Sequence, residues 1–519
     1  MIKKKILFPF LFICLLYNNT NSQNIYDAVN YSLSDFQGTA RYNSMSGSFG
    51  ALGGDLTAIS TNPASSAVFN NGHFSISFGS DKKSNLANVL NARNNYEKNN
   101  LTLNQIGGVV TFDNLDKEKK LTKISFGITY NQTKNNFNEY RLTGISNSSS
   151  IDNYFLNNAN GLRLDQISAF DDESITEAYI DIGNVYGYTH QQAFLGYESF
   201  IIDPFEFDGE NTSYYSNIPQ GEFNQNFRYV SRGYNGKLTF NLGLEYGENI
   251  SFGLNLNSHF IDYDNYTIFD ESNNNGESGN FRVNRVYFEN RLSTFGEGFS
   301  AQFGMIAKVN EILRLGLTYD TPTWYEISEQ TSQYLETNIT NDLDEESLLV
   351  TNPNAINIYE DYNFKTPSKL STSIALVFKG YGLVSFDYSR EDFSSLEFKP
   401  KNDSFFAALN QEIAFNLKDV NTLRFGAEYL IDRISLRGGF MSKSSPYKSS
   451  YITNQNYTIE DTKGFSLGIG YKLKGTTLDL SYVKISNQNF RNLFDTGLTN
   501  QINIDTDNSL ITLSVSTIF

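Results

Sequence analysis

The stretch "KLTFNLGLEYG", residues 237–247, decides the fold. Its positions are alternately apolar and polar or small. A period of two residues predicts a β-strand with one apolar face, because successive side chains of a strand point to opposite sides. The apolar face carries Leu238, Phe240, Leu242, Leu244 and Tyr246, and the other face carries Lys237, Thr239, Asn241, Gly243 and Glu245.

The same alternation recurs along the chain, for example in "TKISFGITY" (122–130), "GFSLGIGYKL" (464–473) and the C-terminal "ITLSVSTIF" (511–519). We predict fourteen strands, an even number that suits an antiparallel arrangement. They are 73–80, 104–112, 122–130, 232–246, 249–262, 296–309, 312–325, 368–378, 381–390, 421–430, 432–441, 463–473, 475–486 and 509–519.

The connections between these strands alternate strictly in length, six short ones with seven long ones. Short periplasmic turns and long outer loops are the pattern of outer-membrane barrels, whereas a soluble sandwich has no reason to sort its loops in this way. The predicted fold class is therefore all-β: a transmembrane antiparallel β-barrel of about 14 strands. The predicted long loops are roughly 81–103, 131–231, 263–295, 326–367, 391–420, 442–462 and 487–508.

The first 22 residues read as a secretory signal peptide. Three lysines (Lys3 to Lys5) precede an apolar run from Ile6 to Tyr17, and small residues precede a cut before Gln23. Cys14 is the only cysteine, so the mature chain has no disulfide framework and no thiolate ligand. No later apolar run reaches the roughly 20 residues that a membrane helix needs.

Charge and residue types exclude several functions. The net charge of −17 makes nucleic acid an unfavourable partner. The histidines His73, His190 and His259 share no ligand-type spacing, so no metal site or cofactor is predicted. Gly464 to Gly468 match G-x-S-x-G, but Ser466 lies within an alternating strand and not on a strand-to-helix turn. We therefore expect no enzyme activity.

Charged residues on the small, polar strand face allow two interpretations. They either pair across strands inside a wet or plugged barrel, which we favour, or line an ion path. The set comprises Glu245, Arg314, Asp320, Asp387, Arg424, Glu428, Arg437, Lys472 and Asp479.

The segment "GGDLTAISTNPASSAVF", residues 53–69, does not alternate. Asp55 and Asn62 are favourable helix N-caps, and Pro63 suits a first helical position, which predicts two short helical turns. A fourteen-stranded lumen is too wide for its own small side chains to fill. Helical turns satisfy their backbone groups locally, so we predict that residues 23–72 form a hatch inside the lumen and residues 73–519 the barrel.

Residues 36–69, "FQGTARYNSMSGSFGALGGDLTAISTNPASSAVF", resemble the N-terminal hatch of the FadL/TodX family of outer-membrane transporters, and most closely the branch common in the Bacteroidetes. The family's Asn-Pro-Ala stands here as Asn62-Pro63-Ala64, after a glycine-rich turn at Gly47 to Gly54. The resemblance implies a hatch that fills the barrel from the periplasmic side and shifts when ligand binds. Its expected gating and substrate-binding residues are Gly53, Gly54, Asp55, Asn62, Pro63 and Ala64.

The resemblance also implies the function: passive uptake of hydrophobic compounds, such as long-chain fatty acids, across the outer membrane of a Gram-negative bacterium. The alternatives are a general diffusion porin, which needs an open lumen, and a surface adhesin or structural barrel. Expected partners are the hydrophobic ligand, outer-membrane lipid or lipopolysaccharide, and the outer-membrane insertion machinery, which would read the terminal Phe519 as an assembly signal.

The 131–231 loop has apolar residues at helical spacing, including Leu164, Ile167 and Ile182. Two interpretations stand side by side. The loop packs a small core of its own, or it forms an apolar groove at the barrel mouth that collects ligand. The groove would comprise Phe170, Ile175, Tyr179, Phe194 and Leu195.

Overall fold

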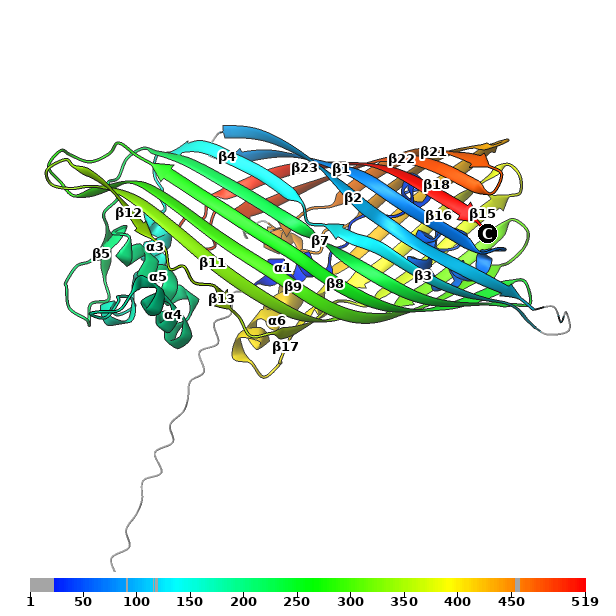
Figure 1. Ribbon diagram of the computed structural model, residues 1–519, viewed down its shortest axis with the longest axis horizontal. Coiled ribbons are helices and arrows are strands. Elements are labelled where there is room, and N and C mark those ends of the chain that lie inside the picture. Colours follow the sequence, from blue (N-terminus) through cyan, green and yellow to red (C-terminus); the bar gives the residue numbers. More distant parts are fainter. Residues whose placement is uncertain (1–22, 90–91, 115, 117–119, 453–457) are drawn as a thin grey trace, which may run out of the picture.

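Fourteen wall positions form a closed antiparallel β-barrel, which confirms the predicted fold class (Figure 1). The computed structural model describes residues 23–89, 92–114, 116, 120–452 and 458–519. The predicted leader, residues 1–22, lies outside the described residues. The wall strands are β1 (His73–Val89), β2 (Ala92–Asp113), β3 (Leu121–Asn135), β7 (Phe223–Tyr246), β8 (Ile250–Ser272), β9 (Arg282–Lys308), β10 (Leu313–Asp320) with β11 (Trp324–Thr340), β15 (Lys369–Phe378), β16 (Gly382–Asp392), β18 (Asp419–Ile431), β19 (Ile434–Lys443), β21 (Thr462–Leu473), β22 (Thr476–Asn492) and β23 (Gln501–Ile518).

The ladder closes where the first strand meets the last. β1 pairs with β23 from His73 opposite Ile518 to Asn88 opposite Asn503. β10 and β11 share one wall position, because both pair with β9, and the chain between them contains Pro322, which has no N–H to donate. Each of the fourteen predicted strands therefore corresponds to one wall position.

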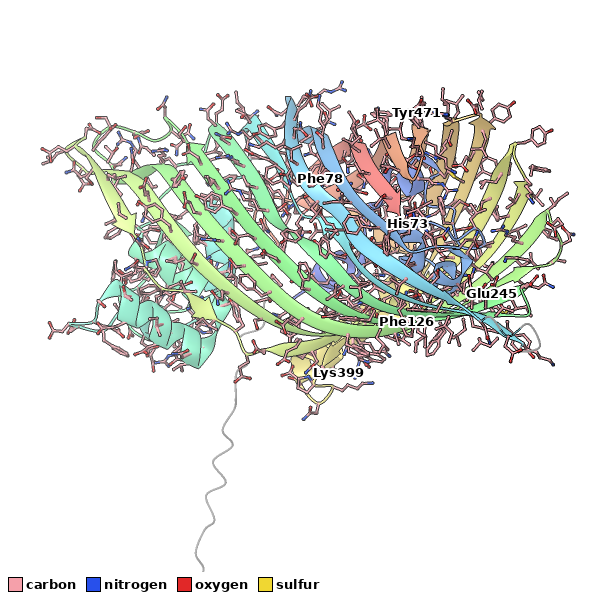
Figure 2. All side chains as sticks on the ribbon, turned by 45° about the vertical axis from the view of Figure 1, so that its right-hand side comes forward. His73, Phe78, Phe126, Glu245, Lys399 and Tyr471 are labelled. Carbon is pink, nitrogen blue, oxygen red and sulfur yellow. The ribbon has the colours of Figure 1, made fainter. Side chains whose placement is uncertain are left out.

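The outer face of the wall is apolar and the inner face is small and polar. Phe78 and Phe126, labelled in Figure 2, are 55% and 50% exposed. Inward-facing Thr239 and Ser466 are 0% and 1% exposed. The closed ladder pairs the wall's backbone groups over most of its length, so this apolar exterior is suited to lipid. No described helix is long and apolar enough to cross a membrane.

Three predicted long loops are wrong, because strand pairing continues through them. β1 and β2 pair up to Val89 opposite Ala92, and β8 pairs with β9 up to Ser272 opposite Arg285. β22 likewise pairs with β23 up to Asn492 opposite Gln501. Residues 81–103, 263–295 and 487–508 thus largely extend the barrel. Their Asn-, Ser- and Thr-rich sequences lack apolar alternation, but the backbone ladder needs none where the outer face leaves the lipid.

The other long connections carry further elements at the long-loop end. Residues 131–231 contain β4 (Asn138–Ser146), α3 (Asp152–Ala159), η3 (Leu164–Gln166), α4 (Ile175–Tyr186), α5 (Tyr188–Glu198), β5 (Ile202–Pro204) and β6 (Tyr214–Ser216). Residues 326–367 add β12 (Glu346–Thr351), β13 (Asn357–Ile358) and β14 (Tyr362–Lys365). The remaining elements are η4 (Phe393–Ser395), β17 (Glu397–Lys399), α6 (Ser404–Asn416), α7 (Ser449–Ile452) and β20 (Thr458–Ile459).

A seam interrupts the wall between β2 and β4. β2 pairs with β3 only as far as Gln105 opposite Asn131, whereas β4 pairs with β7 alone among the described strands. Side chains bridge the seam: Lys98 of β2 forms an ion pair with Glu139 of β4 at 3.7 Å. The wall is therefore continuous at the short-turn end and held by side chains at this point.

The N-terminal segment, residues 23–72, lies inside the barrel (Figure 1) and packs against several wall strands. It contains α1 (Ile25–Ser32), α2 (Ala40–Ser44), η1 (Thr57–Ser60) and η2 (Pro63–Val68). The two predicted helical turns are confirmed as the 3₁₀ helices η1 and η2. Asn62 caps η2 as predicted, because its Oδ1 accepts from the Ala64 N–H at 3.1 Å.

We expect Phe519→Ser to lower the yield of assembled barrel. The Phe519 N–H donates to the Gly72 carbonyl at 3.0 Å, at the end of the closing β1–β23 ladder. Losing an exposed terminal aromatic removes little packing, so a fall in yield would reflect assembly. The measurement is the amount of heat-modifiable protein in the membrane fraction, with the exposed Phe415→Ser as control. Equal yields for both variants would contradict an assembly role.

Candidate functional site

A buried charge network ties the N-terminal segment to the barrel wall. Arg41 of α2 binds Glu428 of β18 through Nε at 3.1 Å and Nη2 at 3.2 Å. Glu428 also accepts from Arg437 Nε at 2.5 Å, and Arg437 Nη1 donates to Asp479 at 2.6 Å. Glu428, Arg437 and Asp479 are buried. The interpretation that inward charges pair across strands is confirmed for them, with Arg41 as an added partner.

Other inward side chains of the wall bind the backbone of the N-terminal segment. Asn255 donates to the Ile59 carbonyl at 2.8 Å, and Asn241 donates to the Pro63 carbonyl at 2.9 Å. Arg314 donates to the Leu52 carbonyl at 3.0 Å, and Asp387 accepts from the Gly50 N–H at 2.9 Å. Ser466 donates to the Ser44 carbonyl at 2.9 Å, which gives the serine of the G-x-S-x-G match a structural partner.

Glycines on the wall allow the segment to come this close. A Cβ added at Gly253 of β8 would lie 2.1 Å from the Pro63 carbonyl carbon. A Cβ at Gly316 of β10 would lie 2.2 Å from the Gly50 oxygen. Both neighbours are backbone atoms, which cannot rotate away. The small residues of the alternating strands are therefore required by backbone contact with the N-terminal segment.

The six predicted hatch residues lie together in this packed region. Gly53 and Gly54 adopt φ of +65° and +68°, conformations that favour glycine. Asp55 accepts from the Thr57 N–H at 2.8 Å and from the Thr39 hydroxyl at 2.7 Å. Asn62 Nδ2 donates to the Gly50 carbonyl at 2.7 Å and to the Met305 carbonyl at 3.1 Å. With Pro63 and Ala64, they hold the segment together and against the wall.

An aromatic cavity of about 560 Å³ lies between α1 and the outer elements. α1 supplies one side, α3 and α5 supply Tyr154 and Tyr188, and α6 and α7 supply Phe405 and Tyr451. Tyr154 and Phe494 have ring centroids 4.8 Å apart. The apolar and aromatic lining comprises Ile25, Tyr26, Tyr154, Tyr188, Tyr263, Leu292, Phe405, Tyr451, Leu493 and Phe494.

A polar network fixes α1 beneath the cavity. Glu329 of β11 accepts hydrogen bonds from Tyr31 at 2.6 Å, from Tyr362 at 2.9 Å and from Gln23 at 2.5 Å. Asp27 completes a capping box with Asn24 at the start of α1. Burial, reinforced by the nearby Glu329 carboxylate, raises the pKa of Asp27 well above its usual range. The cavity floor is thus a defined structure held by one wall carboxylate.

Below α1 the lumen is polar. A cavity of about 230 Å³ is lined by side chains that include Lys237, His259, Asp320 and Arg424. A second of about 220 Å³ touches the residues next to the seam, among them Lys83 and Asn138. The barrel interior therefore changes from aromatic above α1 to polar below it.

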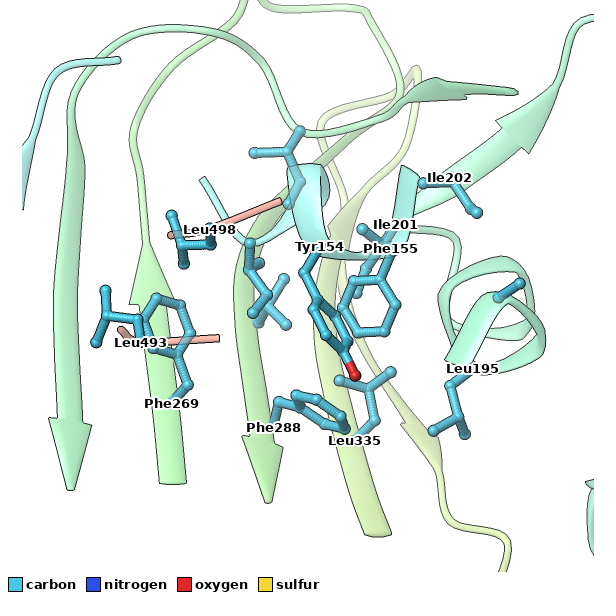
Figure 3. Packing of buried hydrophobic residues seen from close by; sticks show 14 of the residues in the cluster. Tyr154, Phe155, Leu195, Ile201, Ile202, Phe269, Phe288, Leu335, Leu493 and Leu498 are labelled. Carbon is cyan, nitrogen blue, oxygen red and sulfur yellow. The ribbon is translucent and has the colours of Figure 1, made fainter. Parts of the chain in front are cut away.

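The predicted apolar groove is not formed by its five residues. Tyr179, Phe194 and Leu195 are buried in a hydrophobic cluster between the loop helices and the wall, the kind of packing shown in Figure 3 for Phe155 and Leu195 with Phe288 and Leu335. Phe170 is 73% exposed, and Ile175 packs at the cluster's edge. None of the five lines the 560 Å³ cavity. The structure matches the alternative in which this loop packs a core.

Sequence reasoning missed most of the cavity-lining residues. Glu329 and Gln333 alternate on the inner face of β11, in a region assigned to a loop. Phe405 lies on α6 and Tyr451 on α7, both within connections predicted as loops. The alternation of every second residue within 326–340 was the one signal in the sequence that could have predicted this part of the wall.

Comparison with known proteins gives the fold. No family model and no curated protein matches the chain. The crystal structure of a Pseudomonas aeruginosa FadL homologue superposes with a TM-score of 0.55 at 10% identity, covering 94% of this chain and 100% of that one. The Pseudomonas putida toluene transporter TodX gives 0.49 at 11% identity, covering 93% and 99%. The Ralstonia pickettii toluene transporter TbuX gives 0.45 at 14%, also covering 93% and 99%.

Arg41→Met should loosen the N-terminal segment and raise ion leakage. Losing the charge-assisted hydrogen bonds to Glu428 removes about 2 kcal/mol of local stabilisation. In planar bilayers the wild type should conduct little, deletion of residues 23–72 should conduct persistently, and Arg41→Met should lie between them. Arg163→Met, which removes an exposed pair with Asp165, is the control. Steady porin-like conductance in the wild type, unchanged by the deletion, would contradict the plug.

Proposed function

We propose that this chain is an outer-membrane channel of the FadL/TodX family that takes up a hydrophobic compound passively in a Gram-negative bacterium. The observation that supports this most directly is the 560 Å³ aromatic cavity at the outer end of a lumen filled from below. The FadL-like fold and the resemblance of residues 36–69 to the family's hatch support the same function.

Capture depends on burying apolar surface. Polar and charged side chains, among them Glu329, Glu412 and Arg491, line the cavity beside the aromatic ones. A concave site that combines apolar walls with polar groups is typical of a small-molecule site. Aromatic side chains from five helices surround the space, so a ligand that enters leaves water on several sides at once. Long-chain fatty acids and aromatic hydrocarbons are both candidates, because the lining combines aromatic surface with charged groups that include Arg291 and Arg491.

Release in this proposal begins at α1, which separates the aromatic cavity from the polar lumen. Loss of the Tyr31–Glu329 and Gln23–Glu329 hydrogen bonds on ligand binding would loosen the floor, which also packs against the wall through Ile25, Val29 and Tyr31. The ligand then has two exits: downward past the segment from Thr39 to Phe69, or sideways through the β2–β4 seam. The downward exit requires the Arg41–Glu428 pair to break, whereas the sideways exit does not.

The diffusion-porin alternative conflicts with the filled lumen. A porin needs a continuous water-filled path, and here backbone atoms of the N-terminal segment contact the wall at Gly253 and Gly316. For the adhesin or structural-barrel alternative, we find no supporting feature in the described part of the chain.

Replacing a cavity aromatic should weaken binding of an apolar probe. We expect Phe494→Ser to reduce affinity for the neutral dye N-phenyl-1-naphthylamine about tenfold, because a buried aromatic contributes 1–3 kcal/mol by apolar burial. The measurement is dye fluorescence titrated with detergent-solubilised protein. Phe170→Ser, an exposed residue of the groove predicted from sequence, is the matched control. Loss of binding in Phe170→Ser alone would favour that groove and contradict the cavity.

A disulfide between the plug and the wall separates the two exits. The Cβ built at Gly50 lies 3.0 Å from Ser373 Cβ, closer than the roughly 3.5–4.5 Å of disulfides, so the two residues must move apart by about half an ångström. Gly50→Cys with Ser373→Cys should form the bond, and no other cysteine is expected in the mature chain. If ligand leaves through the seam, the oxidised protein should take up dye into proteoliposomes as fast as the protein with reduced cysteines. Uptake that stops on oxidation and returns with reductant would instead assign the downward exit.

A further inference from the structure

On β7, β8 and β9 the outward side chains change from apolar to charged toward the long-loop end. Phe240, Leu256 and Phe303 are exposed on the apolar part. Above them Phe260 stacks on Tyr130, with centroids 6.3 Å apart, and meets Tyr234 edge-on at 5.7 Å. Aromatic girdles of this kind mark the boundary between lipid tails and headgroups in outer-membrane barrels.

A concavity of about 290 Å³ lies on the same outer wall, directly beyond this aromatic group. Cross-strand register places its residues in two neighbouring rows. One row holds Arg232 opposite Asp264, and the next holds Val230 opposite Tyr266 and Tyr266 opposite Arg291. The full lining is Arg228, Val230, Arg232, Asp264, Tyr266 and Arg291.

The concavity has an excess of positive charge, although the chain as a whole carries −17. Three arginines and one carboxylate line it. Arg291 binds Asp264 through Nε at 3.2 Å and Nη2 at 2.9 Å. Arg228 binds Glu139 at 2.7 Å. The exposed Arg232 side chain has no hydrogen-bond or ion-pair partner within the described part of the chain.

The surrounding charges preserve this excess. Glu139 is shared by Arg228, Arg141 and Lys98, so cations outnumber carboxylates on its side of the concavity. Two further acids adjoin the concavity: Asp262 on β8, opposite Tyr234, and Glu289 on β9, which accepts a hydrogen bond from the Tyr287 hydroxyl. An anion that enters the concavity therefore meets one free guanidinium and two whose carboxylate partners leave N–H donors unused.

We propose that this concavity binds the headgroup of a phosphorylated glycolipid in the outer leaflet. Guanidinium groups bind phosphate oxygens through paired N–H donors. Adjacent strands lie about 4.8 Å apart and residues rise about 3.3 Å along a strand. Arg228, Arg232 and Arg291 therefore have backbones about 10 Å or more apart, a spread that suits a headgroup with two phosphates better than one with a single phosphate.

The position of the concavity relative to the aromatic girdle supports a lipid occupant. With acyl chains against the apolar wall below Phe260, the phosphates of the same molecule reach the arginines without leaving the surface. Val230 and Tyr266 would contact the sugar between them. The inference rests on the outer-membrane placement of the barrel, and it is independent of which compound the channel carries.

The test is native mass spectrometry of the full chain in dodecyl maltoside, titrated with diphosphorylated lipid A. We expect the Arg232→Gln/Arg291→Gln double variant to bind about tenfold more weakly, because each lost charged hydrogen bond contributes on that scale. The matched control is Arg390→Gln, since Arg390 is also an exposed strand arginine paired with an aspartate, Asp419, at 2.6 Å. It should bind as the wild type does.

Three further arms decide the assignment. Monophosphorylated lipid A should bind more weakly than the diphosphorylated form, and phosphatidylcholine should not compete. Equal losses in Arg390→Gln and the double variant would overturn the site, as would equal binding of phosphatidylcholine. Displacement of the lipid by millimolar inorganic phosphate would assign the site to a free anion and overturn the lipid. Heat-modifiable mobility should stay unchanged in the double variant. Dye binding is compared in Arg232→Gln alone, because Arg291 also lines the 560 Å³ cavity; unchanged dye binding there separates this proposal from the proposed transport function.

Discussion

The structure depends on filling a lumen that the barrel wall cannot fill by itself. A fourteen-stranded ladder satisfies its own backbone but leaves its small inward side chains far apart. The N-terminal segment occupies that space with few regular hydrogen bonds of its own, so its buried backbone groups need partners. Wall side chains such as Asn241, Asn255 and Arg314 provide them. Inward side chains of the wall are consequently small where the backbone of the N-terminal segment comes close. They are polar where that backbone needs a hydrogen-bond partner.

Much of the fold could be predicted because it follows from local periodicity. A period of two located all fourteen wall positions, and the alternation of loop lengths showed closure without any knowledge of pairing. Asn62 and Pro63 predicted a capped helical turn, because the Asn side chain accepts a hydrogen bond at a helix start and Pro suits the first helical position. These features need only neighbouring residues. The outer extensions of the strands could not be predicted from a period of two residues. Outside the lipid both faces of a strand contact water, so the alternation of apolar and polar residues is absent.

The site could be predicted far less well, since its contacts join distant parts of the chain. Arg41 meets a partner 387 positions away, and the floor of the cavity rests on Glu329, 298 positions from Tyr31. Helical spacing correctly indicated α4, but it could not show whether Tyr179 would face a ligand or a neighbouring strand. Apolar residues at a barrel mouth serve both purposes, and only the position of the wall distinguishes them. Tyr179 in fact bonds Gln333 from within the packed loop.

The distribution of polarity along the lumen links the plug to the choice of ligand path. An apolar ligand gains from the aromatic cavity above α1 and would lose that gain in the polar cavities below, which are lined by groups such as Lys237 and Asp320. Moving the segment from Thr39 to Phe69 would also break the Arg41–Glu428 pair and would remove wall donors such as Asn241 and Asn255 from the plug's backbone carbonyls. At the seam, by contrast, the wall is held by side-chain contacts in place of a backbone ladder, such as Lys98 with the buried Glu139 and Asn85 with the Glu139 carbonyl at 2.9 Å. If the chain carries an apolar ligand as proposed, exit through the wall would leave the contacts between plug and wall in place, whereas exit downward would break them.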